Sequence, residues 1–329
     1  MMNNCLLSIC IPTYNRLFKL KQQIDCLLSL DDPRFEIVVS DNQSTDGTIE
    51  YLKSINNTKL KVLHQDSVSS ARNITNALIN ADGDFALLLL DKDSLSIEGL
   101  PEILDYLSNT TAKAGFCRLD IKEREGEGCA FLEPSESFPK NAYLCRHPSG
   151  YFYHSKEMKI ELEDSEELIQ KEFPFIWDVV FTHMASKYDT LIVKIPFMSS
   201  ESDYEGTKIK SLTYNVNNLW FSPEQVTNRY LFFLNDLGTI SLSDELKNKT
   251  RYKLMRDCFR NSTIQYAWVL SNHDLCLHYG IPNTRLSVKN MFKIAQSVYN
   301  KLKMSGYNKW LYRLLLYTRL RIMYYSLSR

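Results

Sequence analysis

Short apolar runs alternate with segments of helical periodicity over the first 120 residues, and this alternation constrains the fold more than any other feature of the chain. The apolar runs cover residues 6–11, 35–40, 60–64 and 85–90. A helical apolar stripe between the first two runs is formed by Leu17, Leu20, Ile24, Leu27 and Leu28. Such alternation is typical of parallel strands joined by crossover helices. We therefore predict a doubly wound α/β layer.

The remainder of the chain divides into a polar stretch and a helical C-terminal part. Residues 122–148 are polar and rich in Glu and Gly at their start, which predicts a mobile loop. The acidic residues between 161 and 167 indicate a solvated helix face rather than a metal site. Residues 173–186 and 225–237 have helical patterns. We expect a catalytic domain over residues 1–210 and a helical extension over residues 211–329.

The charge is distributed unevenly although the net charge is zero. Ten Lys and Arg but no Asp or Glu occur from Leu275 onward, so the preceding residues carry a net charge of about −10. Basic and aromatic residues interleave over residues 299–329, which suits a helix in an anionic membrane interface. A packed helix or an oligomer interface is the alternative, and the oligomeric state stays open. No nucleic-acid-binding module accompanies the basic residues, so nucleic acid is not an expected partner.

The expected cellular location rests on the absence of a membrane-spanning run and of a secretory signal from the sequence. We find no run of about 18 uncharged apolar residues and no secretory signal pattern. The eight cysteines show no CxxC pair, which argues against a zinc site and fits a reducing compartment. We expect the protein in the cytoplasm, either free or bound peripherally to the inner face of the cell membrane.

Polar residues follow three of the predicted strands at the edge where parallel sheets bind ligands. They lie at residues 12–16, 41–48 and 91–93. Asp91 and Asp93 come after an uninterrupted Ala/Leu run, and an extended backbone would place both carboxylates on one side. Such a pair can hold Mn²⁺ or Mg²⁺ together with diphosphate oxygens. An acidic turn after a buried strand is the alternative.

These segments, in this order, resemble the opening of the family 2 glycosyltransferases of the GT-A fold. The first two read Pro12-Thr13-Tyr14-Asn15 and Asp41-Asn42-Gln43-Ser44-Thr45-Asp46-Gly47-Thr48. The next two read Ala71-Arg72-Asn73 and Ala81-Asp82-Gly83-Asp84-Phe85, and the last leads to Asp91-Lys92-Asp93. The resemblance covers residues 5–120 closely and residues 150–198 loosely. It implies a GT-A-type, mostly parallel sheet flanked by helices.

The resemblance also implies roles for individual residues. Nucleotide binding falls to Pro12, Thr13, Tyr14, Asn15, Asp41, Arg72, Asp91 and Lys92. Within this set the first three residues would line the base pocket, Asp41 would accept a hydrogen bond from the base, and Arg72 would reach the diphosphate. Asp91 and Asp93 would bind the Mn²⁺ or Mg²⁺. Tyr14 as a packing residue, Asp41 as a turn former and Arg72 in a surface salt bridge are the alternatives.

One position departs from the family pattern. Lys92 stands at the centre of the carboxylate triplet, where the family often has a small or acidic residue. A cation beside the metal would weaken metal binding unless the Lys92 side chain points to solvent or to a phosphate.

A catalytic base is expected in the loosely matching region. An inverting transfer needs a carboxylate that takes the proton from the attacking hydroxyl. By the resemblance, Asp178 is the expected base, with Trp177 beside the acceptor sugar and Glu172 as the rival carboxylate. A helix-capping or salt-bridging role for Asp178 is the alternative.

The resemblance thus predicts a metal-dependent inverting glycosyltransferase. It would move a sugar from a nucleoside diphosphate sugar, with uridine the commonest base in the family, to a carbohydrate or lipid-linked saccharide acceptor in surface polysaccharide synthesis. Two alternatives are a non-catalytic binding or scaffold protein on the same fold and a sugar nucleotidyltransferase. The second is disfavoured because no Gly-rich triphosphate loop follows the first strand.

Overall fold

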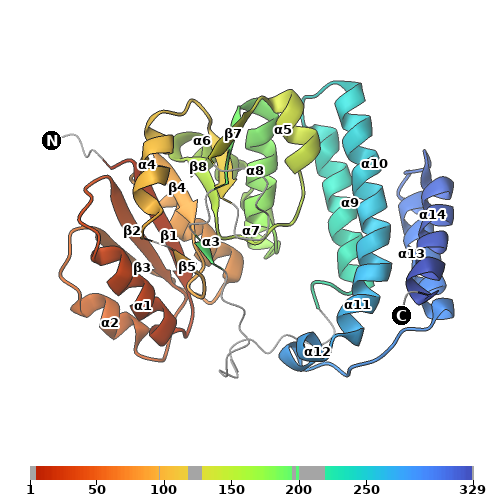
Figure 1. The fold of residues 1–329 in the computed structure, drawn as a ribbon, viewed down its shortest axis with the longest axis horizontal. Helices are drawn as coiled ribbons and strands as arrows, with labels where there is room; N and C mark the ends of the chain where they lie inside the picture. The colour runs from red at the N-terminus through yellow and green to blue at the C-terminus, as the bar shows by residue number, and fades with distance from the viewer. Residues whose placement is uncertain (1–4, 96, 118–127, 195–197, 200–218, 328–329) are drawn as a thin grey trace. The chain divides into compact units, whose positions relative to one another are not determined.

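A computed structural model describes residues 5–95, 97–117, 128–194, 198–199 and 219–327 (Figure 1). The chain forms two compact units, Met1–Lys208 and Ile209–Arg329. The predicted boundary after residue 210 lies outside the described residues. Each unit is described below by itself.

An eight-stranded mixed sheet forms the centre of the first unit, in the order β3-β2-β1-β4-β8-β6-β9-β7. Its strands are β1 Leu7–Thr13, β2 Phe35–Asp41, β3 Leu60–His64, β4 Phe85–Leu88, β6 Ala114–Cys117, β7 Cys129–Leu132, β8 Tyr151–His154 and β9 Thr190–Val193. The first four strands run parallel, whereas β8 runs antiparallel to both β4 and β6. A separate antiparallel pair joins β5 (Ser94–Leu95) to β10 (Met198–Ser199). The sheet and its helices have the predicted GT-A-type arrangement.

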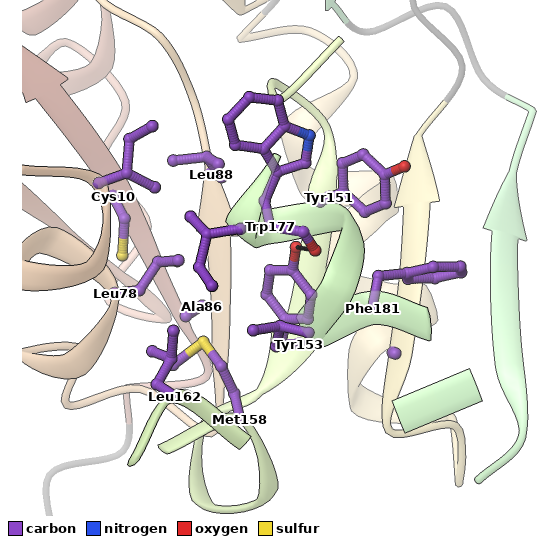
Figure 2. Packing of buried hydrophobic residues seen from close by; sticks show 14 of the residues in the cluster. Cys10, Leu78, Ala86, Leu88, Tyr151, Tyr153, Met158, Leu162, Trp177 and Phe181 are labelled. Atoms are coloured by element: carbon purple, nitrogen blue, oxygen red, sulfur yellow. Dashed lines mark hydrogen bonds between the residues drawn. The ribbon is translucent and has the colours of Figure 1, made fainter. Parts of the chain in front are cut away.

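Helices cover both faces of the sheet. In the first unit they are α1 Leu17–Leu28, α2 Thr48–Ser54, α3 Ser70–Ile79, α4 Leu100–Ser108, α5 Pro134–Asn141, α6 Ser155–Asp164, α7 Glu166–Gln170 and α8 Ile176–Lys187. Side chains of β1 alternate between two cores, as the period of a strand requires. Leu7, Ile9 and Ile11 pack with α1 and α4, and Cys10 packs with α3, α6 and α8. Figure 2 shows the second of these cores, where the Tyr153 hydroxyl donates to the Trp177 carbonyl oxygen at 2.8 Å.

Two local predictions are wrong. The predicted mobile loop contains β7 and α5 from residue 129 onward, because Phe138, Ala142 and Tyr143 are buried in this segment. Residues 118–127 lie outside the described residues.

Glu161 is buried rather than solvated, and it pairs with Lys187 at 2.5 Å and with His183 at 3.4 Å. Burial raises its pKa, but hydrogen bonds from His183 and Lys187 outweigh burial and leave the pKa lowered. The acidic residues at 163, 164, 166 and 167 are exposed, as predicted.

Gly115 permits a close approach of three strands at the centre of the sheet. A Cβ at this position would lie 2.1 Å from the Leu191 carbonyl oxygen and 2.1 Å from the Phe152 ring. We expect Gly115→Ala to lower the free energy of unfolding by about 2 kcal/mol, because backbone and a buried ring must move. Urea unfolding followed by circular dichroism measures this. The matched control is Gly238→Ala in a helix of the second unit, where a Cβ meets nothing within 4 Å. Equal effects of the two substitutions would contradict the packing argument.

The second unit is entirely helical over its described residues. Its helices are α9 Pro223–Thr239, α10 Asp244–Arg260, a π-helical turn Asn261–Gln265, α11 Tyr266–Ser271, α12 His273–Tyr279, α13 Val288–Met304 and α14 Leu311–Leu327. Helices α9 and α10 pack side by side, as do α13 and α14 (Figure 1). The predicted helix over residues 225–237 is confirmed within α9. No helix in the described part of the chain has the length and apolar character needed to cross a bilayer.

Candidate functional site

The predicted motif loops meet at the carboxyl edge of β1, β2 and β4. The carbonyl oxygen of Thr13 accepts hydrogen bonds from the Asn42 backbone N–H at 3.0 Å and from the Asn73 side chain at 3.1 Å. Asn42 in turn accepts from the Ser69 backbone N–H at 2.9 Å, just before α3. The segments after β1 and β2 and the start of α3 are therefore held together by direct contacts.

Asp41 lies fully buried at the end of β2. Its carboxylate is 3.0 Å from Nδ1 of His64 and accepts from the Ser44 backbone N–H at 3.2 Å. The hydrogen bond from Ser44 is a turn-forming contact, which is the alternative role given to Asp41 in the sequence analysis. His64 was not singled out from the sequence, and its position at the end of β3 was the only signal for it.

Asp91 is also buried, and both of its oxygens have partners. It accepts from the Thr13 hydroxyl at 2.9 Å, from the Tyr14 backbone N–H at 3.3 Å and from the Arg16 guanidinium at 2.8 Å. Burial raises the pKa of the Asp91 carboxyl, and the charge of Arg16 opposes that rise. The Thr13–Asp91 pair thus joins the loop after β1 to the loop after β4.

Asp93 differs from Asp91 because one of its oxygens is left open. Its Oδ2 lies 2.5 Å from Nε2 of His147 and accepts from the Ser149 hydroxyl. Its Oδ1 is buried and has no hydrogen-bond partner among the described residues. An acceptor in this state costs on the order of 1–3 kcal/mol unless a donor or a cation reaches it. Sequence analysis missed His147 and Ser149, which precede the aromatic strand β8.

The two carboxylates do not lie on one extended strand, so the geometric basis of that prediction is wrong. Strand β4 ends at Leu88, and the Asp93 N–H donates to the Leu90 carbonyl oxygen at 3.0 Å in a turn. Asp91 therefore reaches the loop after β1, and Asp93 reaches residues 147–149. Together with Lys92 and residues of α1, they line a cavity of about 140 Å³.

The residues present fit a divalent cation in part. Among the described residues, no group of three or more His, Cys, Asp and Glu side chains could hold a metal ion by itself. The open oxygen of Asp93 is the kind of hard ligand that Mg²⁺ and Mn²⁺ prefer. Mg²⁺ sites in proteins commonly use one or two carboxylates and complete the coordination with phosphate oxygens and water. The donor set therefore suits a cation that arrives with a diphosphate.

The other predicted nucleotide-binding residues lie around this edge. Pro12 is buried within β1 and Tyr14 is partly buried beyond it. Asn15 adopts a φ of 53° and accepts from the Thr45 backbone N–H at 2.7 Å. Arg72 is half-exposed in the first turn of α3, with its guanidinium 3.7 Å from the Glu166 carboxylate. This contact is the surface salt bridge that stands as the alternative for Arg72.

Asp178, the expected base, is fully buried in the first turn of α8. It accepts from the Tyr151 hydroxyl at 2.7 Å and from the Cys145 backbone N–H at 3.1 Å. Burial first, and then the Asp178 charge, raise the pKa of Tyr151, so its hydroxyl keeps its proton. The rival Glu172 is exposed and accepts from the Ser69 hydroxyl and, at 3.1 Å, from the Ala71 N–H.

One segment, residues 142–149, contacts both candidate carboxylates. Cys145 donates its N–H to Asp178, and His147 contacts Asp93. Tyr143 and Cys145 adopt φ values of 53° and 50°, in the left-handed region that residues other than glycine rarely occupy. Backbone strain of this kind costs on the order of 1–3 kcal/mol per residue and concentrates at functional sites. The segment therefore supplies partners to both Asp93 and Asp178.

Comparison with known proteins finds one matching family model. Residues 8–151 match the model of glycosyl transferase family 2. The matched residues include all of the sequence motifs that resemble this family.

Two curated relatives are named as glycosyltransferases. A GalNAc(5)-diNAcBac-PP-undecaprenol beta-1,3-glucosyltransferase of Campylobacter jejuni is 28% identical over 157 residues, 45% of this chain and 50% of the relative. Abequosyltransferase RfbV of Salmonella typhimurium is 31% identical over 137 residues, 39% of this chain and 38% of the relative. The matches thus span half or less of each relative.

Solved structures extend the likeness of fold to nearly the whole chain. The crystal structure of S. aureus TarS 1-349 aligns with a TM-score of 0.62 and 15% identity, covering 98% of this chain and 92% of that one. A complex of the same protein with UDP-GlcNAc aligns equally well, at 17% identity. The prediction of a GT-A-type fold with a helical C-terminal region is confirmed.

Proposed function

We propose that the chain is a metal-dependent inverting glycosyltransferase that moves a sugar from a nucleoside diphosphate to a saccharide acceptor. The observation that carries this proposal is the convergence of Asp41, Asp91 and Asp93 on one sheet edge, with the Asp93 Oδ1 buried and open. Two relatives named as glycosyltransferases support the reaction class. The TarS complex with UDP-GlcNAc makes a uridine donor the first candidate.

The donor would lie across the loops after β1, β2 and β4. Pro12, Thr13, Tyr14 and Asn15 form the wall for the base, and Asp41 accepts from it after exchanging its contact with His64 or Ser44. Arg72 supplies a guanidinium for the diphosphate after leaving Glu166. Lys92 lines the same cavity as Asp91 and Asp93, and it supplies a second positive charge, after Arg72, for a phosphate oxygen.

The cation, Mn²⁺ or Mg²⁺, would be held first by Asp93. Its Oδ2 is occupied by His147 and Ser149, which fix the orientation of the carboxylate and leave Oδ1 for the ion. Asp91 could join it only by giving up Arg16 or Thr13. When bound, the ion supplies positive charge against the diphosphate that leaves.

Asp178 is the proposed base, and it would accept the proton of the attacking acceptor hydroxyl. Its hydrogen bond from the Tyr151 hydroxyl, at 2.7 Å, fixes the orientation of the carboxylate. Because its oxygens are buried, the acceptor must displace the Tyr151 hydroxyl or the Cys145 N–H to reach it. The burial of Asp178 also favours the second candidate function, a binding or scaffold protein on this fold. A measurement of sugar transfer separates the transferase from the scaffold protein.

The proposed setting is the synthesis of a surface polysaccharide on a lipid-linked precursor. The Campylobacter relative is named after a saccharide linked to PP-undecaprenol. A lipid-linked acceptor would place the protein on the cytoplasmic side of the membrane, in peripheral contact through residues 299–329.

Calorimetric titration of UDP, GDP, CDP and dTDP with and without Mn²⁺ tests the donor site. We expect one nucleotide to bind in a Mn²⁺-dependent manner, and we expect Asp93→Asn to weaken Mn²⁺ binding about 100-fold. The matched control is Asp82→Asn, which removes an exposed carboxylate paired with Lys61. Failure of all four nucleotides to bind would favour the scaffold protein.

His147 is expected to act by positioning Asp93. His147→Ala should weaken Mn²⁺ binding about tenfold, as is typical when a group that orients a metal ligand is removed. His147→Gln should restore most of the affinity, because the Gln amide can still donate to Oδ2. Electron paramagnetic resonance of bound Mn²⁺ measures the affinity. A histidine nitrogen coupling in that spectrum would show direct ligation and contradict the positioning role.

A further inference from the structure

One face of α14 exposes a continuous set of large apolar side chains. Seven of them are between 41% and 85% exposed, namely Tyr312, Leu316, Tyr317, Leu320, Met323, Tyr324 and Leu327. At about 100° per residue these positions fall within an arc of about 140°. Leu316, Leu320 and Leu327 lie towards its middle, with tyrosines at either side. No described part of the chain covers this surface, which we term the α14 face.

The opposite side of α14 is part of the core of the second unit. Leu311, Leu314, Leu315 and Ile322 are buried, and the helix packs on α13 and α10. The orientation of the helix is therefore fixed by packing, and the α14 face is held outward. Solvent exposure of so many contiguous apolar side chains is unusual for a soluble surface and marks an interaction site.

The charged residues of α14 itself are all positive. Arg313 and Arg321 are exposed on the same helix, and Lys309 precedes it. No Asp or Glu occurs anywhere in the chain from Leu275 onward. The occupant of this face must therefore offer apolar surface beside negative charge.

We propose that the α14 face docks in the interface of an anionic lipid bilayer, with the helix lying parallel to the membrane. Leucines would enter the acyl boundary, tyrosines would lie at the headgroup level, and Arg313 and Arg321 would meet lipid phosphates. Seventeen residues that include three arginines cannot span the bilayer, which agrees with the absence of a spanning helix among the described residues. A second copy fits less well, because a two-fold contact would bring the arginines of both helices together without a carboxylate on either.

This inference assigns a surface to the peripheral membrane contact proposed above, and it does not depend on sugar transfer, so its test uses no nucleotide. The full chain is sedimented with vesicles of phosphatidylcholine alone or mixed with phosphatidylglycerol. We expect binding to the anionic vesicles, weaker binding at high salt and little binding to the neutral vesicles. Leu316→Glu combined with Leu320→Glu should reduce binding to anionic vesicles about tenfold or more.

The matched control is Leu277→Glu on α12 of the same unit, where the leucine is 75% exposed. This control should bind vesicles like the wild type, and circular dichroism should show that all variants are folded. Equal binding of wild type and the Leu316/Leu320 variant, or equal binding to neutral and anionic vesicles, would overturn the proposal. So would light scattering that shows an oligomer dissociated by the two substitutions while vesicle binding persists.

The vesicle assay and the nucleotide titration test the two proposals independently of each other. We expect the Leu316/Leu320 variant to bind nucleotide like the wild type, because both substitutions lie outside the donor site. A wild-type chain that binds vesicles but no nucleotide would remove the transferase proposal and leave the docking surface standing.

Discussion

Asp178→Asn is expected to lower the rate of sugar transfer by about 10³-fold while donor binding stays close to wild type. A positioned base typically contributes 10²- to 10⁴-fold to the rate, and an amide cannot take the proton from the acceptor hydroxyl. The amide has the shape of the carboxylate, so it can accept from the Cys145 N–H and donate to the Tyr151 oxygen. Release of UDP in the presence of lipid-linked saccharides measures the rate, and calorimetry measures donor binding.

The matched control for this substitution is Glu172→Gln, at the rival carboxylate. Glu172 is exposed and binds the start of α3 through Ser69 and Ala71, so its amide should change the rate by less than tenfold. A large loss for Glu172→Gln with a small loss for Asp178→Asn would exchange the two roles. Loss of neither would favour a non-catalytic binding protein.

The edge of the sheet could be predicted from sequence because its signals are local. Each polar loop directly follows an apolar strand, and the carboxyl ends of parallel strands meet at one edge. The contacts of Thr13 with Asp91 and with Asn73 confirm that these loops converge. Strand order and mixed direction were less accessible, since β8 inserts antiparallel between β4 and β6 by long-range pairing.

The partners of the carboxylates could not be predicted, because they lie far away in the sequence. His147 and Ser149 reach Asp93 across 54 and 56 positions, and neither belongs to a spaced motif. The expectation that Asp91 and Asp93 share one side assumed an extended backbone, whereas a turn begins after β4. Burial of Glu161 depends in the same way on Lys187 and His183, which a local acidic pattern does not show.

Arg16→Met is expected to lower the free energy of unfolding by about 3 kcal/mol at pH 7. Asp91 is 2% exposed and pairs with the Arg16 guanidinium at 2.8 Å. Breaking a buried pair by removing one member is costly because the remaining charge stays in a medium of low dielectric constant. Urea unfolding of the wild type and the variant at several pH values measures the difference.

The pH dependence of this loss has a definite sign. Burial already raises the pKa of Asp91 in the folded protein, and Arg16 limits the rise, so Arg16→Met should raise that pKa further. A raised pKa means that the folded state holds the proton more tightly than the unfolded chain, whose carboxyl pKa is about 3.9. Stability is therefore lost as the pH rises above about 4 through the folded pKa, and the gap between variant and wild type should close towards pH 4.

Asp91→Asn combined with Arg16→Met provides the decisive control. The amide can accept from the Thr13 hydroxyl without carrying a charge, so the double variant should recover most of the stability lost by Arg16→Met at pH 7. Its stability should also lose the pH dependence that Asp91 confers. If the double variant were no more stable than Arg16→Met, the loss would come from packing of the Arg16 side chain, and the charge of Asp91 would not be its cause.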